Sequence, residues 1–312
     1  MSFKLPGKLS AVLTRCEGAF ANMTLKGYRS DLEMFCAWCQ ENGINSYPAK
    51  SADVARFVEA ETERLLPSTL KRRLAAIRFA HVYGDLPDPT KTSVVRLAVR
   101  RATMLKARRP RQVEGLTFEK LQKILKACPS TLEGYRDAAL ISVGYDTLTR
   151  SNELVAMTVE DFDLSDGSPS VLIRRAKSDQ AGDGRIAWLS DDTVHRVRDW
   201  LDASGIISGP IFRAVNYGVP SRLPLANSSV RRAVKKAARR AGLEESAARL
   251  SAHSMRVGGA QDMLVSGFDA LAIMQAGGWT TPDMVLRYVE HAQAGALQRR
   301  RWSSLKAVME AP

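Results

Sequence analysis

The chain has 312 residues, of which 45% are hydrophobic and 25% are charged, and its formal net charge at pH 7 is +13. That length allows two domains with separate cores, the composition excludes a mainly disordered chain, and the positive charge indicates a polyanionic partner, with nucleic acid as the first candidate. No apolar run approaches the length of a membrane-spanning helix and the N-terminus lacks a long apolar core, so we expect no membrane partner and a cytoplasmic protein.

Four helices are predicted in the first part of the chain. Apolar residues recur at helical spacing over residues 24–42. A second helix begins at Ser51, and a third begins with Ser68 or Thr69 as its cap. A fourth spans about residues 90–106. Short helices of this kind predict a compact bundle of four or five helices.

Basic residues recur on these helices. A single basic helix face is usually solvated surface, but recurrence on successive helices of one bundle favours a surface that follows a phosphate backbone. We therefore expect DNA contacts from Lys26, Arg29, Ser68, Lys71, Arg72 and Arg73.

The stretch over residues 108–115 has few apolar residues, and Pro110 interrupts any helix there. Such a stretch predicts an interdomain linker. Because it is basic, Arg108 and Arg109 can also lie along DNA.

The second half of the chain begins with helices, and a short helix with Arg150 at its start then follows. Glu153 lies one turn on, so its carboxylate can hold the guanidinium in place, although the pair could equally be a surface ion pair of small value. Two β-rich runs, SPSVLIRRAKSD and GDGRIAWLS, then predict an antiparallel hairpin with Lys177 at its turn end.

A strongly basic helix is predicted from Asn227, after a connection rich in proline and glycine. Val230, Val234 and Ala238 share its inward face, and paired basic residues recur at every turn. This is the strongest candidate in the sequence for a helix against a DNA groove or backbone, with contacts expected from Asn227, Ser228, Arg231, Arg232 and Lys235.

The segment over residues 250–291 carries the candidate chemistry, which we expect on four successive short helical segments. His253 and Arg256 are three residues apart, so on a helix they leave from one face and can meet one anion. Trp279 follows two glycines, and Tyr288 lies near the end of the next helix. Taken singly, these residues fit a capping histidine, a core tryptophan and a half-buried tyrosine, but the combination is harder to dismiss once Arg150 and Lys177 join it.

Other kinds of site are not indicated. Cys36 and Cys39 lie within a helical pattern and fit small core residues, and with Cys16 and Cys128 they are too few for a disulfide scaffold. We expect no metal site, and no glycine-rich phosphate loop suggests a nucleotide cofactor, so none is expected.

The chain resembles the tyrosine site-specific recombinases of the phage integrase family. The resemblance is carried by six residues in the family's order: Arg150, Lys177, His253, Arg256, Trp279 and Tyr288. The segments AHSMRVGGAQDML and IMQAGGWTTPDMVLRYV carry the most specific match, with tryptophan at 279 where many relatives have histidine. The resemblance implies a mainly helical protein: a core-binding bundle over residues 1–107, the linker over 108–115, and a catalytic domain over 116–312. This last domain would hold a small antiparallel sheet and a C-terminal helix that docks in trans, and the two domains would form a C-shaped clamp on DNA.

The resemblance also implies a mechanism. Tyr288 would attack the scissile phosphate to form a 3′-phosphotyrosyl enzyme without metal or ATP, while arginines at 150 and 256 neutralise the phosphate. His253 would exchange a proton or donate to the phosphate, Trp279 would donate its indole N–H, and Lys177 would protonate the leaving 5′-oxygen. Glu153 would orient the first arginine.

The implied partners are double-stranded DNA with an inverted-repeat recombination site and three further copies of the chain, as a homotetramer on two sites in the nucleoid. Two alternatives remain: a type IB topoisomerase-like enzyme, and a catalytically silent DNA-binding protein on the same fold.

Overall fold

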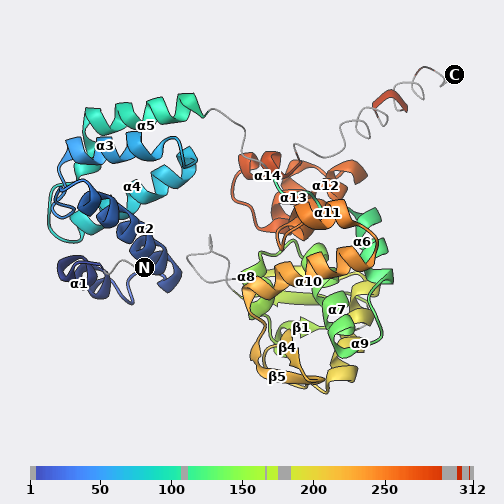
Figure 1. Ribbon diagram of the computed structural model, residues 1–312. Helices are drawn as coiled ribbons and strands as arrows, with labels where there is room; N and C mark the ends of the chain where they lie inside the picture. Colours follow the sequence, from blue (N-terminus) through green and yellow to red (C-terminus); the bar gives the residue numbers. More distant parts are fainter. Residues whose placement is uncertain are drawn as a thin grey trace. The chain divides into compact units, whose positions relative to one another are not determined.

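The chain divides into two compact units, Met1–Pro110 and Arg111–Pro312, in a computed structural model that describes residues 5–106, 112–165, 167–174, 184–289, 301–303 and 309 (Figure 1). Arg108, Arg109 and Lys177 lie outside these ranges, as does most of the predicted C-terminal helix. Both units are mainly helical with small antiparallel sheets in the second, which confirms the predicted fold class. No helix in the described ranges is long and apolar enough to cross a membrane.

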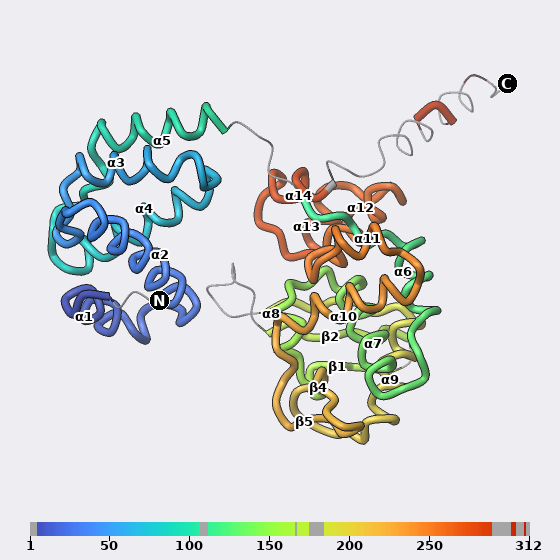
Figure 2. The backbone as a smooth tube through the Cα atoms, viewed as in Figure 1, coloured from blue at the N-terminus to red at the C-terminus, as the bar shows by residue number. Residues whose placement is uncertain are grey.

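Unit 1 is a helical bundle around one core, and its described residues form five α-helices and a short 3-10 helix (Figure 2). One short helix, at the N-terminal end, was not predicted. The elements in chain order are α1 (Gly7–Arg15), α2 (Asn22–Glu41), α3 (Ser51–Glu61), α4 (Pro67–Val82), η1 (Pro89–Lys91) and α5 (Ser93–Leu105).

The predicted cap of α4 was wrong. The helix begins at Pro67, with Leu66 at the N-cap position and no side-chain cap, so Ser68 and Thr69 lie inside the first turn. Proline suits the first helical position because its missing N–H would have no partner there and its fixed φ is already helical. The interpretation of Cys36 and Cys39 is confirmed, since both are buried core residues of α2 with free thiols.

Arg73 is a correction to the expected DNA contacts. Its side chain is only 9% exposed, its Nη1 lies 2.6 Å from Glu61 Oε2, and its guanidinium lies over the Phe57 ring. On α4 it falls between the buried Leu70 and Ile77, three residues back and four ahead, so the helix turns it inward. A buried arginine already paired with a carboxylate is a structural residue rather than a phosphate contact.

The remaining candidates in unit 1 stay at the surface. Lys26, Ser68, Lys71 and Arg72 are exposed and Arg29 is half-buried. The guanidinium of Arg72 donates to the buried Asp31 carboxylate at 2.8 Å, although the arginine side chain itself is 61% exposed.

Unit 2 places helices around two small antiparallel sheets, one of strand order β1-β2-β3 and one of β4-β5. The strand elements are β1 (Phe162–Asp163), β2 (Ser170–Ile173), β3 (Arg185–Trp188), β4 (Arg213–Asn216) and β5 (Val219–Pro224). The helices are α6 (Phe118–Lys126), α7 (Leu132–Asp146), α8 (Ser151–Ala156), η2 (Val159–Asp161), α9 (Asp191–Ser204), α10 (Asn227–Arg240), α11 (Glu244–Arg249), α12 (Ser254–Ser266), α13 (Ala270–Gly277) and α14 (Pro282–Val289).

The predicted hairpin is confirmed by β2 and β3, which pair antiparallel with Leu172 opposite Ile186. The second hairpin, β4-β5, was missed because its sequence is rich in proline and glycine. Its turn uses Tyr217 and Gly218, both with positive φ, as two-residue hairpin turns require.

The core of unit 2 surrounds α7, whose residues from Ala138 to Val143 are almost all buried. Trp200 of α9 is fully buried and donates its indole N–H to the Ile211 carbonyl at 2.9 Å. A helix that is apolar on all sides belongs at the centre of a domain. This central helix supports α12, which begins the candidate site.

Candidate active site

Three elements bring the C-terminal candidates together. His253 is the N-cap residue of α12, Arg256 lies in the first turn of that helix, and Tyr288 lies on α14. Trp279 was expected on a helix but lies in the turn after α13, because Gly278 adopts a left-handed conformation that ends the helix. The indole lies so close to Gly277 that a Cβ at that glycine would overlap the ring.

The Tyr288 hydroxyl is paired with a histidine. Its Oη lies 2.9 Å from His253 Nε2, and the two rings are 5.1 Å apart. The tyrosine ring also lies 5.1 Å from the ring of Trp279. Packing on both sides therefore fixes the direction of the hydroxyl.

Arg256 is fully buried beneath these rings. Its Nη1 donates to the Leu148 carbonyl, and its guanidinium lies 4.0 Å from the centre of the Trp279 ring. Its Nε and Nη2 are also buried, and neither has a hydrogen-bond partner among the described residues. Burial and the neighbouring Arg150 lower the pKa of Arg256 to about 10, so it remains charged at neutral pH. A buried cation with two unused donors is suited to an anion.

Arg150 and Glu153 make the contact that their spacing predicted. The Glu153 carboxylate accepts from the Arg150 backbone N–H at 2.9 Å and from Arg150 Nη1 at 2.8 Å. The glutamate side chain is 2% exposed, whereas that of the arginine is 24% exposed. The buried carboxylate thus holds both the backbone at the start of α8 and one nitrogen of the Arg150 guanidinium. Burial lowers the pKa values of His253 and Arg256, and the positive charge of that guanidinium lowers them further.

Arg185 is a site residue that the sequence reading missed. It begins β3, donates from Nη1 to the Ala276 carbonyl at 2.7 Å and from Nη2 to the Thr147 carbonyl at 2.6 Å, and thereby ties the ends of α13 and α7 together. Burial lowers its pKa to about 10. The only sequence signal was an arginine opening a strand otherwise made of apolar residues.

The charge state of His253 follows from its surroundings. Burial, followed by the positive charges of Arg256 and Arg150, lowers the pKa of His253 to about 4 from the ordinary 6.5. The imidazole is therefore neutral at pH 7 and can accept a proton at the nitrogen that faces Tyr288.

This shift predicts an acid-dependent loss of stability. The unfolded chain takes up a proton on this histidine below about pH 6.5, whereas the folded chain resists until near pH 4, so the stability is complete above 6.5 and is lost as pH falls toward 4. The full difference is about 3 kcal/mol. We expect His253→Gln to make the free energy of unfolding fall less steeply over that window in urea titrations, while the buried His81, whose pKa burial also lowers, keeps part of the slope. Identical pH curves for wild type and His253→Gln would contradict the assignment.

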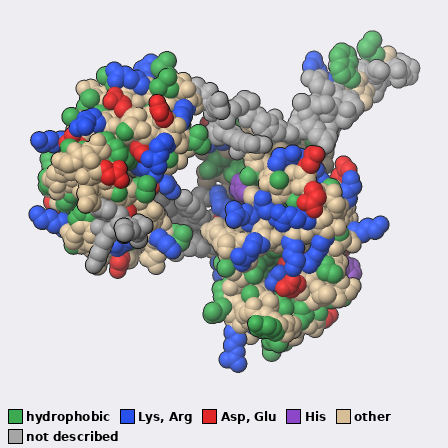
Figure 3. All heavy atoms as spheres, in the orientation of Figure 1, with side chains coloured by type: hydrophobic (Ala, Val, Ile, Leu, Met, Phe, Trp, Pro, Cys, Tyr) green, Lys and Arg blue, Asp and Glu red, His purple; other side chains and the backbone are tan. Residues whose placement is uncertain are grey.

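The helix α10 has the predicted inward face and a basic outer face. Val230, Val234 and Ala238 are buried. Lys and Arg side chains gather along this helix in Figure 3. Asn227, Ser228, Arg231 and Arg232 are exposed, and Lys235 is half-buried with its ammonium on the Ala248 carbonyl.

Within the described ranges, no cluster of three or more His, Cys, Asp or Glu could hold a metal ion.

Comparisons with known proteins match both units. The model of the phage integrase family matches residues 114–294, and that of the N-terminal SAM-like domain of phage integrases matches residues 15–83. An integrase/recombinase XerD homolog from Selenomonas ruminantium is 30% identical over 88% of this chain and 84% of its own length. Recombinase Cre from Escherichia phage P1 is 27% identical over 90% of this chain and 88% of its own length.

Solved structures show the same fold. XerH recombinase bound to its palindromic difH substrate is similar with a TM-score of 0.65 at 18% identity, covering 97% of this chain and 84% of that chain. The Tn1549 transposon integrase in complex with transposon right end DNA has a TM-score of 0.65 at 16% identity, covering 94% of this chain and 97% of that chain. The family match over most of unit 2, together with relatives that align over most of both chains, places this chain in the phage integrase family, the tyrosine recombinases that carry out site-specific DNA recombination.

Proposed function

We propose that the chain cuts and rejoins DNA at specific sites through a 3′-phosphotyrosyl intermediate on Tyr288. The observation that carries this proposal is the Tyr288 hydroxyl on a neutral His253, beside Arg256 with two unused buried donors. A nucleophile, a base and an anion-binding cation therefore lie within one site.

In the first step the Tyr288 oxygen bonds to the scissile phosphorus, and the bond from phosphorus to the 5′-oxygen breaks. The tyrosine proton passes to His253 Nε2, which accepts it because the imidazole is neutral. Lys177 supplies a proton to the departing 5′-oxygen, a role that rests on its place in the family order. The free 5′-hydroxyl of another strand later attacks the phosphotyrosine and releases the enzyme, so the bond energy is conserved without ATP.

The arginines stabilise the charge that grows on the phosphate. Arg256 offers Nε and Nη2, and Arg150 offers the donors not taken by Glu153. Trp279 adds its indole N–H. Fixed guanidinium groups of this kind perform the charge neutralisation for which other phosphoryl-transfer enzymes use metal ions, so none is required in the proposal.

The proposed partner is double-stranded DNA carrying an inverted-repeat recombination site, with basic residues of both units contacting its backbone. The basic outer face of α10 and the exposed Lys71 of α4 support it, as do relatives solved in complexes with DNA. We propose further that four copies assemble on two sites, because an exchange between two duplexes needs four tyrosines. The protein would then act in the cytoplasm, on the nucleoid.

The proposed backbone contacts predict a change in salt dependence. Arg231 is exposed and has no ion-pair partner among the described residues, whereas Lys236 on the same helix is paired with Glu133 at 2.9 Å. We expect Arg231→Ala to lower the log–log slope of affinity against salt by about one unit, since each lost phosphate contact removes that much. Lys236→Ala is the matched control, because its charge is already neutralised. Equal slopes for Arg231→Ala and wild type would mean that this face is only solvated.

The experiment that tests the function uses DNA fragments selected by binding and cloned as one or two copies into a supercoiled plasmid. Deletion or inversion between two copies, with a covalent adduct mapped to Tyr288, is the expected result. Relaxation of plasmid that lacks the sites would favour the topoisomerase-like alternative instead. Binding without strand cleavage would favour the silent DNA-binding protein.

A further inference from the structure

The backbone carbonyl of Tyr288 accepts hydrogen bonds from two side-chain amides. Gln261 Nε2 donates to it at 3.1 Å, and Gln112 Nε2 donates to it at 3.3 Å. A carbonyl oxygen has two lone pairs, so the two amides together fill its capacity. One atom of the candidate nucleophile residue is thus held from two different parts of the chain.

Gln261 fixes one side of this arrangement. It lies on α12, the helix that also carries Arg256, and it is only 7% exposed. Its amide oxygen lies against Gly115, where an added Cβ would overlap it and would also come within 3.2 Å of the Gly258 backbone. The entry segment, which we define as residues 112–117 where the chain enters unit 2, therefore lies directly against α12.

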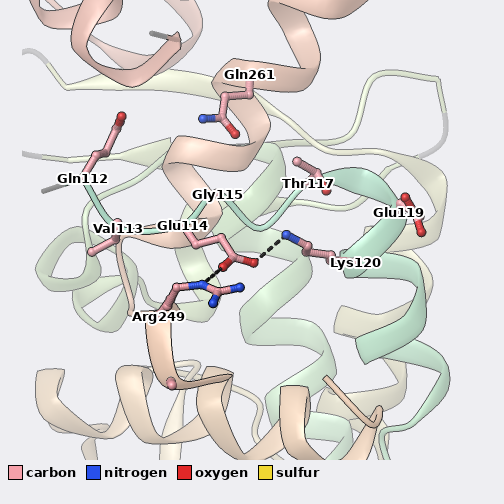
Figure 4. Close-up of a pocket in the computed structure, with 10 residues that line it drawn as sticks. Gln112, Val113, Glu114, Gly115, Thr117, Glu119, Lys120, Arg249 and Gln261 are labelled. Atoms are coloured by element: carbon pink, nitrogen blue, oxygen red, sulfur yellow. Dashed lines mark hydrogen bonds and ion pairs between the residues drawn. The ribbon is translucent and has the colours of Figure 1, made fainter. Parts of the chain in front are cut away.

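The entry segment is itself anchored firmly (Figure 4). The Glu114 carboxylate accepts from Lys120 Nζ at 2.5 Å and from Arg249 Nε at 2.5 Å. It also accepts from Ser246 Oγ at 2.6 Å. Burial alone would raise its pKa, but these hydrogen bonds outweigh burial and hold the pKa of Glu114 at about 2. The Leu116 N–H also donates to the Ser254 carbonyl of α12 at 2.8 Å.

The helix α14, by contrast, has few apolar anchors. Of the residues from Pro282 to Tyr288, only Val285 is buried, while Leu286 is 60% exposed and Met284 37% exposed. A helix this short is marginal by itself and depends on tertiary contacts. The two amides therefore add to the ring contacts with His253 and Trp279 in fixing the position of Tyr288.

We propose that Gln112 and Gln261 act as positioning residues, forming a two-amide clamp that keeps the Tyr288 hydroxyl on His253, and that the clamp couples the entry segment to the nucleophile. The inference rests on the proposed role of Tyr288. Loss of the bond from Gln112 would loosen α14, so strand cleavage depends on the contact between the entry segment and Tyr288. Gln112 Oε1 is buried without a hydrogen-bond partner among the described residues, so the bond from Nε2 to the Tyr288 carbonyl is the described hydrogen bond of this side-chain amide.

The test replaces each glutamine by methionine, which has similar length but no donor, and by glutamate, which donates only when protonated. Full-length variants are bound to a cloned site, and the single-turnover rate of covalent adduct formation is measured beside the Kd. We expect Gln112→Met and Gln261→Met each to slow adduct formation about fivefold, the scale of one neutral hydrogen bond, with Kd unchanged. Gln122→Met, on α6 with no hydrogen bond to Tyr288, is the matched control.

The glutamate variants make the cleavage rate depend on pH if the side chain acts through a hydrogen bond. A purely packing role would give no such pH dependence. Near pH 8 a carboxylate faces the Tyr288 carbonyl and repels it, so cleavage by Gln261→Glu is at least as slow as by Gln261→Met. As the pH falls toward 5 the carboxyl gains a proton and can donate, so the rate ratio of Gln261→Glu to Gln261→Met should rise. A ratio that stays constant across this range overturns the clamp.

Two kinds of failure are distinguishable. If the wild-type adduct maps to a residue other than Tyr288, the proposed function fails and the clamp fails with it. If the adduct maps to Tyr288 and both methionine variants cleave at the wild-type rate, only the clamp is wrong. Weaker DNA binding with an unchanged cleavage rate also overturns the clamp, because a positioning role requires slower cleavage with an unchanged Kd.

Discussion

Tyr288→Phe is expected to abolish the covalent protein–DNA adduct while leaving the Kd for DNA within about twofold of wild type. The hydroxyl that is removed makes one described contact, the 2.9 Å hydrogen bond with His253. The ring keeps its packing against His253 and Trp279, so the fold of the site is preserved. Loss of a nucleophile lowers the rate by at least about 10⁴-fold.

The measurement is adduct formation on a nicked site that traps the intermediate, followed by denaturing gel electrophoresis. His253→Ala is the companion variant, because the tyrosine oxygen remains but its proton acceptor is gone. We expect that variant to form the adduct about 10² to 10⁴ times more slowly, the contribution of a positioned acid or base. An adduct that survives denaturation with Tyr288→Phe would remove Tyr288 from the proposed role.

The part of the site that local sequence could predict is the part built from short-range spacing. Arg150 and Glu153 are one helical turn apart, and they form the predicted contact. His253 and Arg256 share the start of one helix. Helical periodicity is a local property, so it specifies which side chains leave together from one face.

The part that could not be predicted depends on contacts between distant segments. Arg185 reaches the carbonyls of Thr147 and Ala276, which lie 38 and 91 residues away in the sequence. Gln112 reaches Tyr288 across 176 residues. Neither contact can be predicted from the spacing of residue types, because every residue has a backbone carbonyl that could accept the hydrogen bond.

Arg73 shows a different limit of the sequence reading. Its neighbours Lys71 and Arg72 are exposed, and a run of three basic residues resembles one charged face. A helix turns about 100° per residue, so three consecutive side chains cannot share a face. The apolar pattern of α4 indicates that Arg73 lies on the inward face. It does not indicate that the buried Glu61 carboxylate lies there to pair with it.

Arg256→Lys is expected to lower strand cleavage about 10² to 10³-fold, the cost of removing a preorganised donor to transition-state charge. The guanidinium already gives Nη1 to the Leu148 carbonyl, which leaves Nε and Nη2 for a phosphate. A lysine in the same place has one ammonium that cannot hold the carbonyl and fork onto two phosphate oxygens at once. Folding stability should fall by about 1 kcal/mol, the scale of the single hydrogen bond to the Leu148 carbonyl, because the other two donors that are removed have no described partner.

Arg185→Lys is the matched comparison, since this arginine is also buried and its pKa is also lowered to about 10 by burial. Its Nη1 and Nη2 are both engaged by carbonyls, so the substitution removes structural bonds rather than phosphate donors. We expect its free energy of unfolding to fall by about 1 to 3 kcal/mol, while the folded fraction still cleaves faster than Arg256→Lys. Urea unfolding and single-turnover cleavage separate the two arginines. Near wild-type cleavage by Arg256→Lys, or equal cleavage defects in both variants, would mean that the unused donors of Arg256 do not face the phosphate.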